Sequence, residues 1–222
     1  MARGGSKRIP NKNIKDFHGK PIIHYSIAAA LSSECFERVI VSTDSKKIAE
    51  ISLKEGAEVP FLRSELNSND IATTPDALIE VLECLEKQGE KYETFCCIYP
   101  TSPLIKSDII KEAFELCRDK DEIDGVIPVT VFSYPIQRSL RIKDDYVMMA
   151  DERYIHTRSQ DLEECYHDAG QFYFLRTAAF KKSKNLWLPK IKPLILPHLE
   201  VQDIDNQADW EIAELKYTII NS

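Results

Sequence analysis

Residues 38–56, RVIVSTDSKKIAEISLKEG, contain the repeating unit on which the fold depends. The first five of these residues form a short apolar run, which is typical of a buried strand. Asp44 or Ser45 follows directly and can cap a helix, which the sequence predicts over residues 47–56. A buried strand that leads at once into a helix is typical of α/β proteins.

The same alternation continues on both sides of this stretch. The spacing of apolar residues predicts helices over 22–32, 75–88 and 107–118, the last of them capped by Ser107. Short apolar runs predict further strands at 59–62, 95–99 and 125–129. Strands that alternate with helices favour one α/β domain over residues 1–222, with an open and largely parallel sheet.

The alternation breaks after Thr130. Residues 132–165 form a long segment rich in Tyr, Arg and Asp, with hairpin-like pieces at 139–149, which indicates an inserted lobe. A strand at 171–175 resumes the pattern. The apolar spacing of residues 208–221 then predicts a final amphipathic helix with Trp210 in the core.

The composition is that of a globular protein with an acidic balance. Apolar residues make up 43% of the chain, charged residues 29%, and the net charge is -7. Domains that bind nucleic acid are usually basic, so the composition argues against that class of partner. No apolar run reaches the ~20 residues of a membrane span, and the polar start is unlike a signal peptide. The six cysteines lack CxxC spacing, which argues against a zinc site and favours a cytoplasmic location.

Residues 2–13, ARGGSKRIPNKN, concentrate glycines together with basic and amide side chains. Glycines let backbone N–H groups approach a phosphate closely, and Ser6 adds a hydroxyl donor. Arg3, Lys7 and Lys12 supply the positive charge that a polyphosphate requires. The GxxxxGK[ST] spacing of a Walker A loop is absent. The residues alone leave two alternatives open, a loop that binds a polyphosphate and a solvated basic terminus.

Six segments of the chain together resemble the cytidylyltransferases that activate acidic sugars, a family that includes the CMP-sialate synthetases. They are ARGGSKRIPNKN (2–13), IVSTDS (40–45), FLRSELNSND (61–70), YPTSPL (99–104), YHDAGQFYF (166–174) and QDIDNQADW (202–210). YHDAGQFYF is most similar to the pseudaminic acid cytidylyltransferases, because the sialate enzymes typically carry an RPNG-like sequence there. The resemblance implies a Rossmann-like nucleotide-binding domain of the nucleotide-diphospho-sugar transferase type.

The activity that this resemblance implies is transfer of CMP from CTP to a nonulosonic acid, with release of pyrophosphate. Pseudaminic acid is the first candidate, because Tyr99 replaces the glutamine common in the sialate enzymes. The same reaction on N-acetylneuraminic, legionaminic or 3-deoxy-octulosonic acid stays open. A CTP-binding protein that has lost catalysis is a further alternative.

The resemblance also assigns roles to individual residues. Arg3, Ser6 and Lys7 match phosphate-binding positions. Lys12 matches a lysine that stabilises the charge developing at the α-phosphate. The remaining positions expected around the nucleotide and the sugar are Asn13, Arg63, Asp70, Thr74, Tyr99, His167 and Gln171.

Asp203 and Asp205 are separated by a single residue. In an extended segment, residues i and i+2 point to the same side, and two carboxylates so placed can hold Mg²⁺ against phosphates. Paired acidic residues near a surface are more often simply solvated. The resemblance favours the Mg²⁺ site, with Lys12 and these two aspartates as the catalytic residues. It leaves open whether one aspartate accepts the proton of the sugar hydroxyl instead.

Members of the resembled family usually have an apolar strand immediately before ARGGSK, whereas Met1 directly precedes Ala2 here. That strand would lie in the centre of the sheet. Two neighbouring strands are therefore expected to lack a partner, which lowers the expected stability. The lobe at 132–165 is expected to reach a second subunit, so that a homodimer forms with its active site near the interface.

Overall fold

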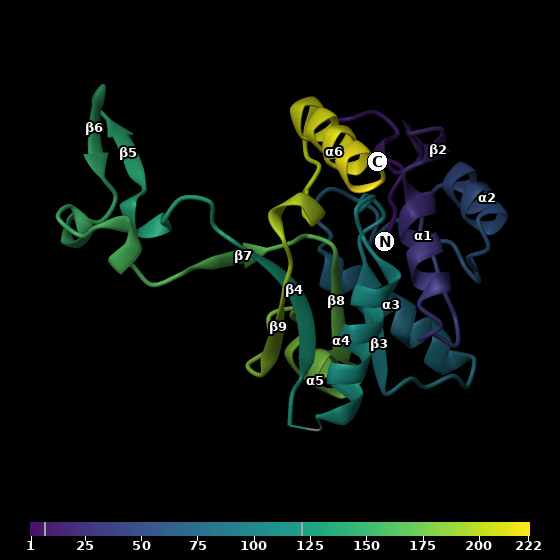
Figure 1. The fold of residues 1–222 in the computed structure, drawn as a ribbon. Coiled ribbons are helices and arrows are strands. Elements are labelled where there is room, and N and C mark those ends of the chain that lie inside the picture. The colour runs from purple at the N-terminus through teal and green to yellow at the C-terminus, as the bar shows by residue number, and fades with distance from the viewer. Residues whose placement is uncertain (7, 121) are drawn as a thin grey trace.

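The computed structural model describes residues 1–6, 8–120 and 122–222 of the chain. The helices of this part are α1 (Ile23–Ser32), α2 (Lys46–Lys54), α3 (Thr74–Lys87), α4 (Ser107–Asp119), α5 (Thr177–Ser183) and α6 (Gln207–Ile220). Its strands are β1 (Asp16–Phe17), β2 (Lys20–Pro21), β3 (Thr94–Ile98), β4 (Gly125–Val131), β5 (Leu140–Lys143), β6 (Tyr146–Met149), β7 (Tyr166–Asp168), β8 (Phe172–Arg176) and β9 (Ile191–Ile195). Helices surround a central sheet, and the β5–β6 hairpin stands apart from the body (Figure 1).

The central sheet has the strand order β3-β8-β4-β7, with β9 paired to β4. The α/β class agrees with the sequence, but the sheet is mixed. The β4–β9 pair is parallel, whereas the β3–β8, β4–β8 and β4–β7 pairs are antiparallel. The inserted lobe explains this difference. The chain leaves the body after β4 and returns along β7, which lies beside β4. The strands β7 and β8 are therefore antiparallel to β4.

The predicted strand at 38–42 is reduced to one parallel bridge between Ile40 and Glu58. Glu58 N–H donates to Val39 O, and Val41 N–H donates to Glu58 O, both at 2.8 Å. The strand predicted at 59–62 is not formed in the structure. Within the described ranges, residues 38–42 have a strand partner on one side only, which accounts for the short pairing.

Most helix ends lie where the sequence places them. The Ser45 side chain caps α2 by accepting from Ile48 N–H, and Thr73 forms a capping box with Asp76 at the start of α3. The helix α4 differs, because Ser107 is its first residue and Lys106 takes the cap position without a side-chain bond. Local side-chain chemistry therefore fixes α2 and α3 directly.

The hairpin lobe and the body differ in burial. In the body, Trp210 of α6 is buried and packs edge-on against Phe17, as the sequence predicts. In the lobe, large apolar side chains are exposed on both hairpin strands: Leu140, Ile142, Tyr146, Val147 and Met148. The six cysteines are free thiols. No helix within the described ranges combines the length and apolar character needed to cross a bilayer.

Gly125 begins β4 where the backbone of β8 comes very close. A Cβ atom added at this position would lie 2.4 Å from Phe174 O and 2.6 Å from Leu175 Cδ2. We expect Gly125→Ala to lower the free energy of unfolding by about 1–3 kcal/mol, because neighbouring backbone has to shift. Urea unfolding of the variant measures this change.

Gly5→Ala is the matched control for that substitution, because nothing lies within 4 Å of a Cβ added there. We expect its unfolding free energy to stay within about 0.5 kcal/mol of the parent chain. Equal unfolding midpoints for the two alanine variants would contradict the close approach of β4 and β8.

Candidate active site

The glycine-rich loop at the start of the chain is anchored to the body. Gly4 N–H donates to Asp44 Oδ1 at 2.8 Å. The Asn13 side chain is buried, and its amide donates to Arg3 O at 2.8 Å. These bonds favour the phosphate-binding loop over a solvated terminus, since they fix the loop backbone from both ends. Lys7, also predicted to bind phosphate, lies outside the described residues.

Arg3 brings the loop against the segment at 61–70. Its Nη1 atom lies 3.0 Å from Asp70 Oδ1 and donates to Asn69 O at 3.3 Å. Both side chains of the ion pair are about half exposed, at 41% and 55%. Exposed ion pairs contribute at most about 1 kcal/mol, so Arg3 can exchange this carboxylate for a phosphate with little loss. Ser6 lies half-buried further along the same loop.

Two basic side chains of the loop hold the segment that carries the predicted aspartates. Lys12 Nζ donates to Ile204 O at 2.5 Å. Arg8 Nη2 lies 2.7 Å from Asp205 Oδ1. Lys12 and Arg8 therefore both lie beside the segment that carries Asp203 and Asp205.

The electrostatics of this cluster shift two pKa values. Burial lowers the pKa of Lys12, while the charges of Asp205 and Asp203 oppose that shift. Burial also raises the pKa of Asp203, and the neighbouring Asp205 charge raises it further. A carboxylate that is hard to ionise is a good partner for a cation or a transferred proton.

The donor set here suits a hard cation only in part. Asp203 and Asp205 offer carboxylate oxygens, which are the ligands that Mg²⁺ prefers. Across the part of the chain that the structure describes, no group of three His, Cys, Asp or Glu side chains could hold a metal ion. The two aspartates thus fit Mg²⁺ that takes its other ligands from phosphates and water, as is usual for this ion.

Gly170 forms a tight turn beside Asp203. Its φ is +63°, and a Cβ atom added there would lie 3.6 Å from both Cβ and Cγ of Asp203. Ser102 Oγ donates to Gly170 O at 3.2 Å, and Gly170 N–H donates to Asp168 Oδ1 at 2.9 Å. The YPTSPL and YHDAGQFYF segments therefore meet at the aspartate cluster.

A line of polar contacts leads from this turn toward α3. Tyr173 donates its hydroxyl proton to Asp168, and its ring centroid lies 5.8 Å from that of Tyr99. The Thr74 side chain lies close enough to Tyr99 to influence the pKa of its hydroxyl group. Burial raises the pKa values of both tyrosines, which keeps their hydroxyl groups protonated. Thr74 and Tyr99, both predicted site residues, are thus connected to the Gly170 turn.

The side chains of two other predicted site residues are hydrogen-bonded to groups of the protein itself. Gln171 is buried and its Nε2 donates to Glu200 O at 2.5 Å. Arg63 is also buried, with Nε 2.9 Å from Ser42 Oγ and Nη2 2.5 Å from Ser42 O. Both support the backbone around the site in this structure.

His167 lies further from the aspartate cluster, at the base of the lobe. Its Nδ1 atom is 2.9 Å from Asp168 O, and its ring centroid is 4.9 Å from that of Phe132. The structure therefore places His167 between the body and the lobe, without a contact to the loop at 2–13 among the described residues.

Neither Arg8 nor Asp168 is among the catalytic and binding residues predicted from the sequence. Arg8 follows Lys7 in the basic loop, so the charge pattern could have indicated it. Asp168 precedes Gly170 by two residues, which is the spacing of a side chain that accepts from the backbone of a turn.

Known proteins resemble this chain over nearly its whole length. The family model described as Cytidylyltransferase matches residues 1–212. A pseudaminic acid cytidylyltransferase of Campylobacter jejuni is 42% identical over 219 residues, which cover 98% of this chain and 94% of the relative. A CMP-N,N'-diacetyllegionaminic acid synthase of Legionella pneumophila is 32% identical over 96% of this chain and 92% of its own length.

A solved structure shares the fold. The CMP:2-keto-3-deoxy-manno-octonic acid synthetase complexed with CTP superposes with a TM-score of 0.69 and 16% identity, over 99% of this chain and 96% of that one. At such low sequence identity, the superposition shows a shared fold and nothing about function. The family model and the sequence relatives together show that this chain belongs to the cytidylyltransferase family, whose members are nucleotidyltransferases.

Proposed function

We propose that this chain transfers CMP from CTP to pseudaminic acid and releases pyrophosphate. The observation that carries the proposal is the 42% identity to a pseudaminic acid cytidylyltransferase over nearly the whole chain. The relative named for legionaminic acid is 32% identical, so the same reaction on legionaminic acid is the second candidate. Its larger sequence distance makes it the weaker one.

The chemistry follows from the residues around the aspartate cluster. The anomeric hydroxyl oxygen of the sugar attacks the α-phosphorus of CTP, and the bond from that phosphorus to the bridging oxygen of the β-phosphate breaks. Arg3 and Arg8 neutralise the phosphates, and Lys12 stabilises charge on the oxygens of the α-phosphate. Asp203, with its raised pKa, accepts the proton of the attacking hydroxyl.

Mg²⁺ is the cation that we propose for this site, held by Asp205 together with phosphate oxygens, while Asp203 stays available to accept the proton. When bound, it supplies positive charge that stabilises the departing pyrophosphate. Arg8 Nη2 lies 2.7 Å from Asp205 Oδ1, so we expect its guanidinium group to move to the phosphates when CTP and the cation bind.

The reaction can be followed by the release of pyrophosphate. We expect release from CTP and pseudaminic acid with Mg²⁺, and none when EDTA removes the cation. Legionaminic acid in the same assay tests the second candidate. Absence of pyrophosphate with every acidic sugar would overturn the proposal, and binding of CTP without release would identify a protein that has lost catalysis.

We further propose that the lobe at 132–165 joins two copies of the chain. Ile142 and Val147 face each other across the β5–β6 hairpin, and 79% and 64% of their surfaces are exposed. Exposed apolar side chains on a projecting hairpin are typical of an interaction surface. We therefore keep the prediction of a cytoplasmic homodimer whose active site lies near this interface. The CMP-linked sugar that the reaction produces would serve as the donor for a glycosyltransferase.

The dimer prediction can be tested on the hairpin. We expect the double variant Ile142→Asp with Val147→Asp to sediment as a monomer, because charges on both strands prevent apolar burial. Arg141→Ala is the matched control, since Arg141 pairs with Met148 on the opposite face of the hairpin. Sedimentation velocity distinguishes a monomer from a dimer. An unchanged oligomeric state in the aspartate variant would contradict the proposed interface.

A further inference from the structure

The aspartate segment (residues 201–206), which carries Asp203 and Asp205, has no regular secondary structure. It connects the short helix η5 (His198–Glu200), which follows β9, to the start of α6 (Figure 1). Ile204 lies between the two aspartates, is fully buried and packs in the cluster that contains Trp210. Because successive side chains of an extended segment point to opposite sides, Ile204 directs both aspartates away from that cluster. The position of the two carboxylates therefore depends on how the backbone of this segment is held.

The downstream end of the segment is held by the first turn of α6. Asp209 Oδ2 accepts from the backbone N–H groups of Asp205 and Asn206, at 2.9 Å and 3.0 Å. The Asn206 side chain in turn accepts from Asp209 N–H, which completes a capping box. Lys12 adds a bond from the glycine-rich loop to Ile204 O. This end is thus fixed by the start of the helix and by a residue already placed in the site.

The upstream end is held by a lysine from the later part of the same helix. Lys216 is half-buried, and its Nζ atom donates to Val201 O at 2.6 Å and to His198 O at 3.0 Å. Between these two carbonyl groups, Glu200 O accepts from Gln171 Nε2. One ammonium group therefore makes two of the three side-chain bonds that hold this end.

The surroundings of Lys216 make these two bonds important. Burial lowers the pKa of Lys216 from its ordinary value of 10.5, so the ammonium group has lost part of its water. A buried charge is costly unless hydrogen bonds replace that water, and a charged donor forms stronger bonds than a neutral one. The two carbonyl oxygens supply the replacement. Removal of the ammonium group frees both of them at once.

Helix α6 can hold both ends because it is itself anchored. Trp210 and Ala213 lie between Asp209 and Lys216 in the sequence, and both are buried. The two residues that bind the segment thus project from one helix that is packed into the body. Loss of either one leaves the helix in place and releases one end of the segment.

We propose that Lys216 is a positioning residue for the transfer reaction, because it fixes the upstream end of the segment that presents Asp203 and Asp205. This inference rests on the proposed function, since it assigns Lys216 a task in that site. Lys216 acts through the backbone of residues 198–203. Mg²⁺ requires nearly ideal ligand geometry, and a misplacement of about 1 Å can lower a rate by about 10²-fold.

The first test measures how much Mg²⁺ tightens the binding of CTP. Calorimetry gives the dissociation constant of CTP in EDTA and in Mg²⁺, and the ratio of the two is the gain from the cation. We expect this gain to fall at least fivefold in Lys216→Met, while the affinity in EDTA stays within twofold. Lys216→Arg keeps the charge and the donors, so it should keep the gain within threefold.

The second test needs no ligand and uses amide hydrogen exchange followed by NMR. Val201 N–H donates to His198 O and reports on the upstream end, while Asp205 N–H reports on the aspartates. We expect exchange at both amides to be at least tenfold faster in Lys216→Met. Exchange at Trp210, which donates to Asn206 O, should be unchanged because α6 stays in place.

Gly125→Ala is the control for a general loss of stability, because its close contact lies between β4 and β8. Its gain from Mg²⁺ and its exchange at Asp205 should equal those of the parent chain. If Lys216→Met does not fold, Lys216→Gln removes the charge and keeps a shorter donor. The same changes are expected in this variant, with at least a threefold effect.

Unchanged exchange at Asp205 in the folded variants overturns the proposal. Faster exchange at Val201 alone also overturns it, because Lys216 would then hold η5 without positioning the aspartates. If the parent chain gains nothing from Mg²⁺, exchange at Asp205 decides alone. Release of pyrophosphate by the parent chain tests the proposed function separately, so the two proposals can fail independently.

Discussion

Replacing Lys12 by methionine will lower kcat/KM for cytidylyl transfer by about 10²–10³-fold, the range seen when a single charge-stabilising donor is removed from an active site. The Lys12 ammonium group is partly buried, donates to Ile204 O and lies close to Asp203 and Asp205. Methionine keeps most of the length and the apolar stem of the side chain, and it removes the ammonium group with its charge and its hydrogen bond to Ile204 O. Steady-state pyrophosphate release measures the loss.

Lys15→Met is the matched control on the same segment. Lys15 lies over the ring of Trp210 and donates to Gln207 Oε1 at 3.1 Å, so that both of these partners belong to α6. We expect this variant to keep its kcat/KM within about twofold, since surface substitutions away from a site have small effects. If both methionine variants lose activity equally, the loss reflects damage to the fold, and Lys12 has no special role.

Removing the charge of Asp203 is expected to lower kcat by about 10²-fold or more, because the proton acceptor of the sugar hydroxyl is lost. In Asp203→Asn, the shape of the side chain is kept. Asp205→Asn is expected to act differently, by raising the Mg²⁺ concentration required for half-maximal rate. Kinetics over a range of Mg²⁺ concentrations separate the two effects.

Asp145→Asn is the control for these substitutions, because Asp145 lies exposed in the turn of the hairpin lobe and its φ of +65° suits asparagine. Its kinetics should match those of the parent chain. An Asp203→Asn variant that keeps full kcat would show that another group accepts the proton.

The raised pKa of Asp203 also predicts an effect on stability. Its ionised form is less favourable in the folded chain than in the unfolded chain, so ionisation destabilises the fold as pH rises above the ordinary value of 3.8. Asp203→Asn should therefore melt at a slightly higher temperature than the parent chain at pH 7, and this difference should vanish below pH 3.8. Thermal unfolding at several pH values measures the trend. A variant that is less stable at pH 7 would contradict the predicted direction.

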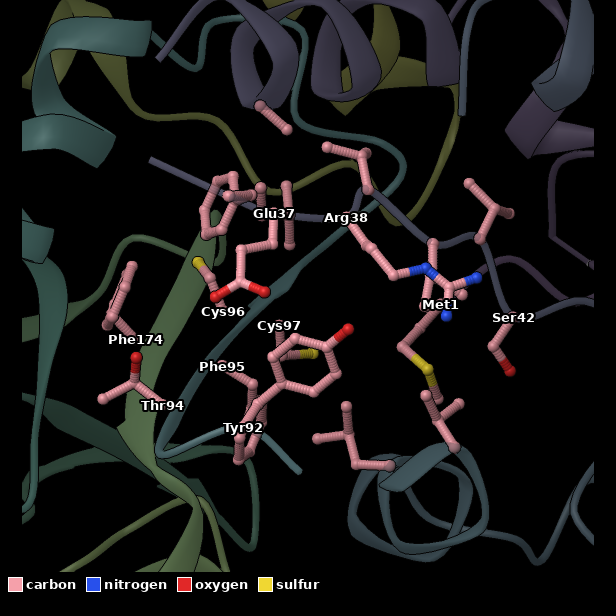
Figure 2. Close-up of a pocket in the computed structure, with 18 of the residues that line it drawn as sticks. Met1, Glu37, Arg38, Ser42, Tyr92, Thr94, Phe95, Cys96, Cys97 and Phe174 are labelled. Carbon is pink, nitrogen blue, oxygen red and sulfur yellow. The ribbon is translucent and has the colours of Figure 1, made fainter. Parts of the chain in front are cut away.

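The sequence predicts those elements whose formation depends on local chemistry. Ser45 and Thr73 cap helices in the structure, and the apolar spacing of residues 208–221 corresponds to α6 with Trp210 buried. The sheet was harder to predict, because strand direction depends on the path of the chain through the lobe. The apolar run at 38–42 pairs so little because one of its edges lines a cavity (Figure 2).

The residues of the candidate site likewise divide into those that local sequence patterns indicate and those that only the fold brings together. The basic loop and the aspartate pair were evident from residue type and spacing, and the structure brings Lys12, Asp203 and Asp205 together. The contact of Arg8 with Asp205 joins residues 197 positions apart, which no local pattern indicates. Arg63 illustrates the opposite case, since a residue type suited to phosphate is held here by the backbone and hydroxyl of Ser42.

A competition between two acidic sugars tests the proposed substrate most directly. CTP and Mg²⁺ are supplied with equal concentrations of pseudaminic acid and N-acetylneuraminic acid, and mass spectrometry measures the ratio of the two CMP-linked products. We expect CMP-pseudaminic acid to exceed CMP-N-acetylneuraminic acid at least tenfold. Equal amounts, or an excess of CMP-N-acetylneuraminic acid, would contradict pseudaminic acid as the preferred substrate.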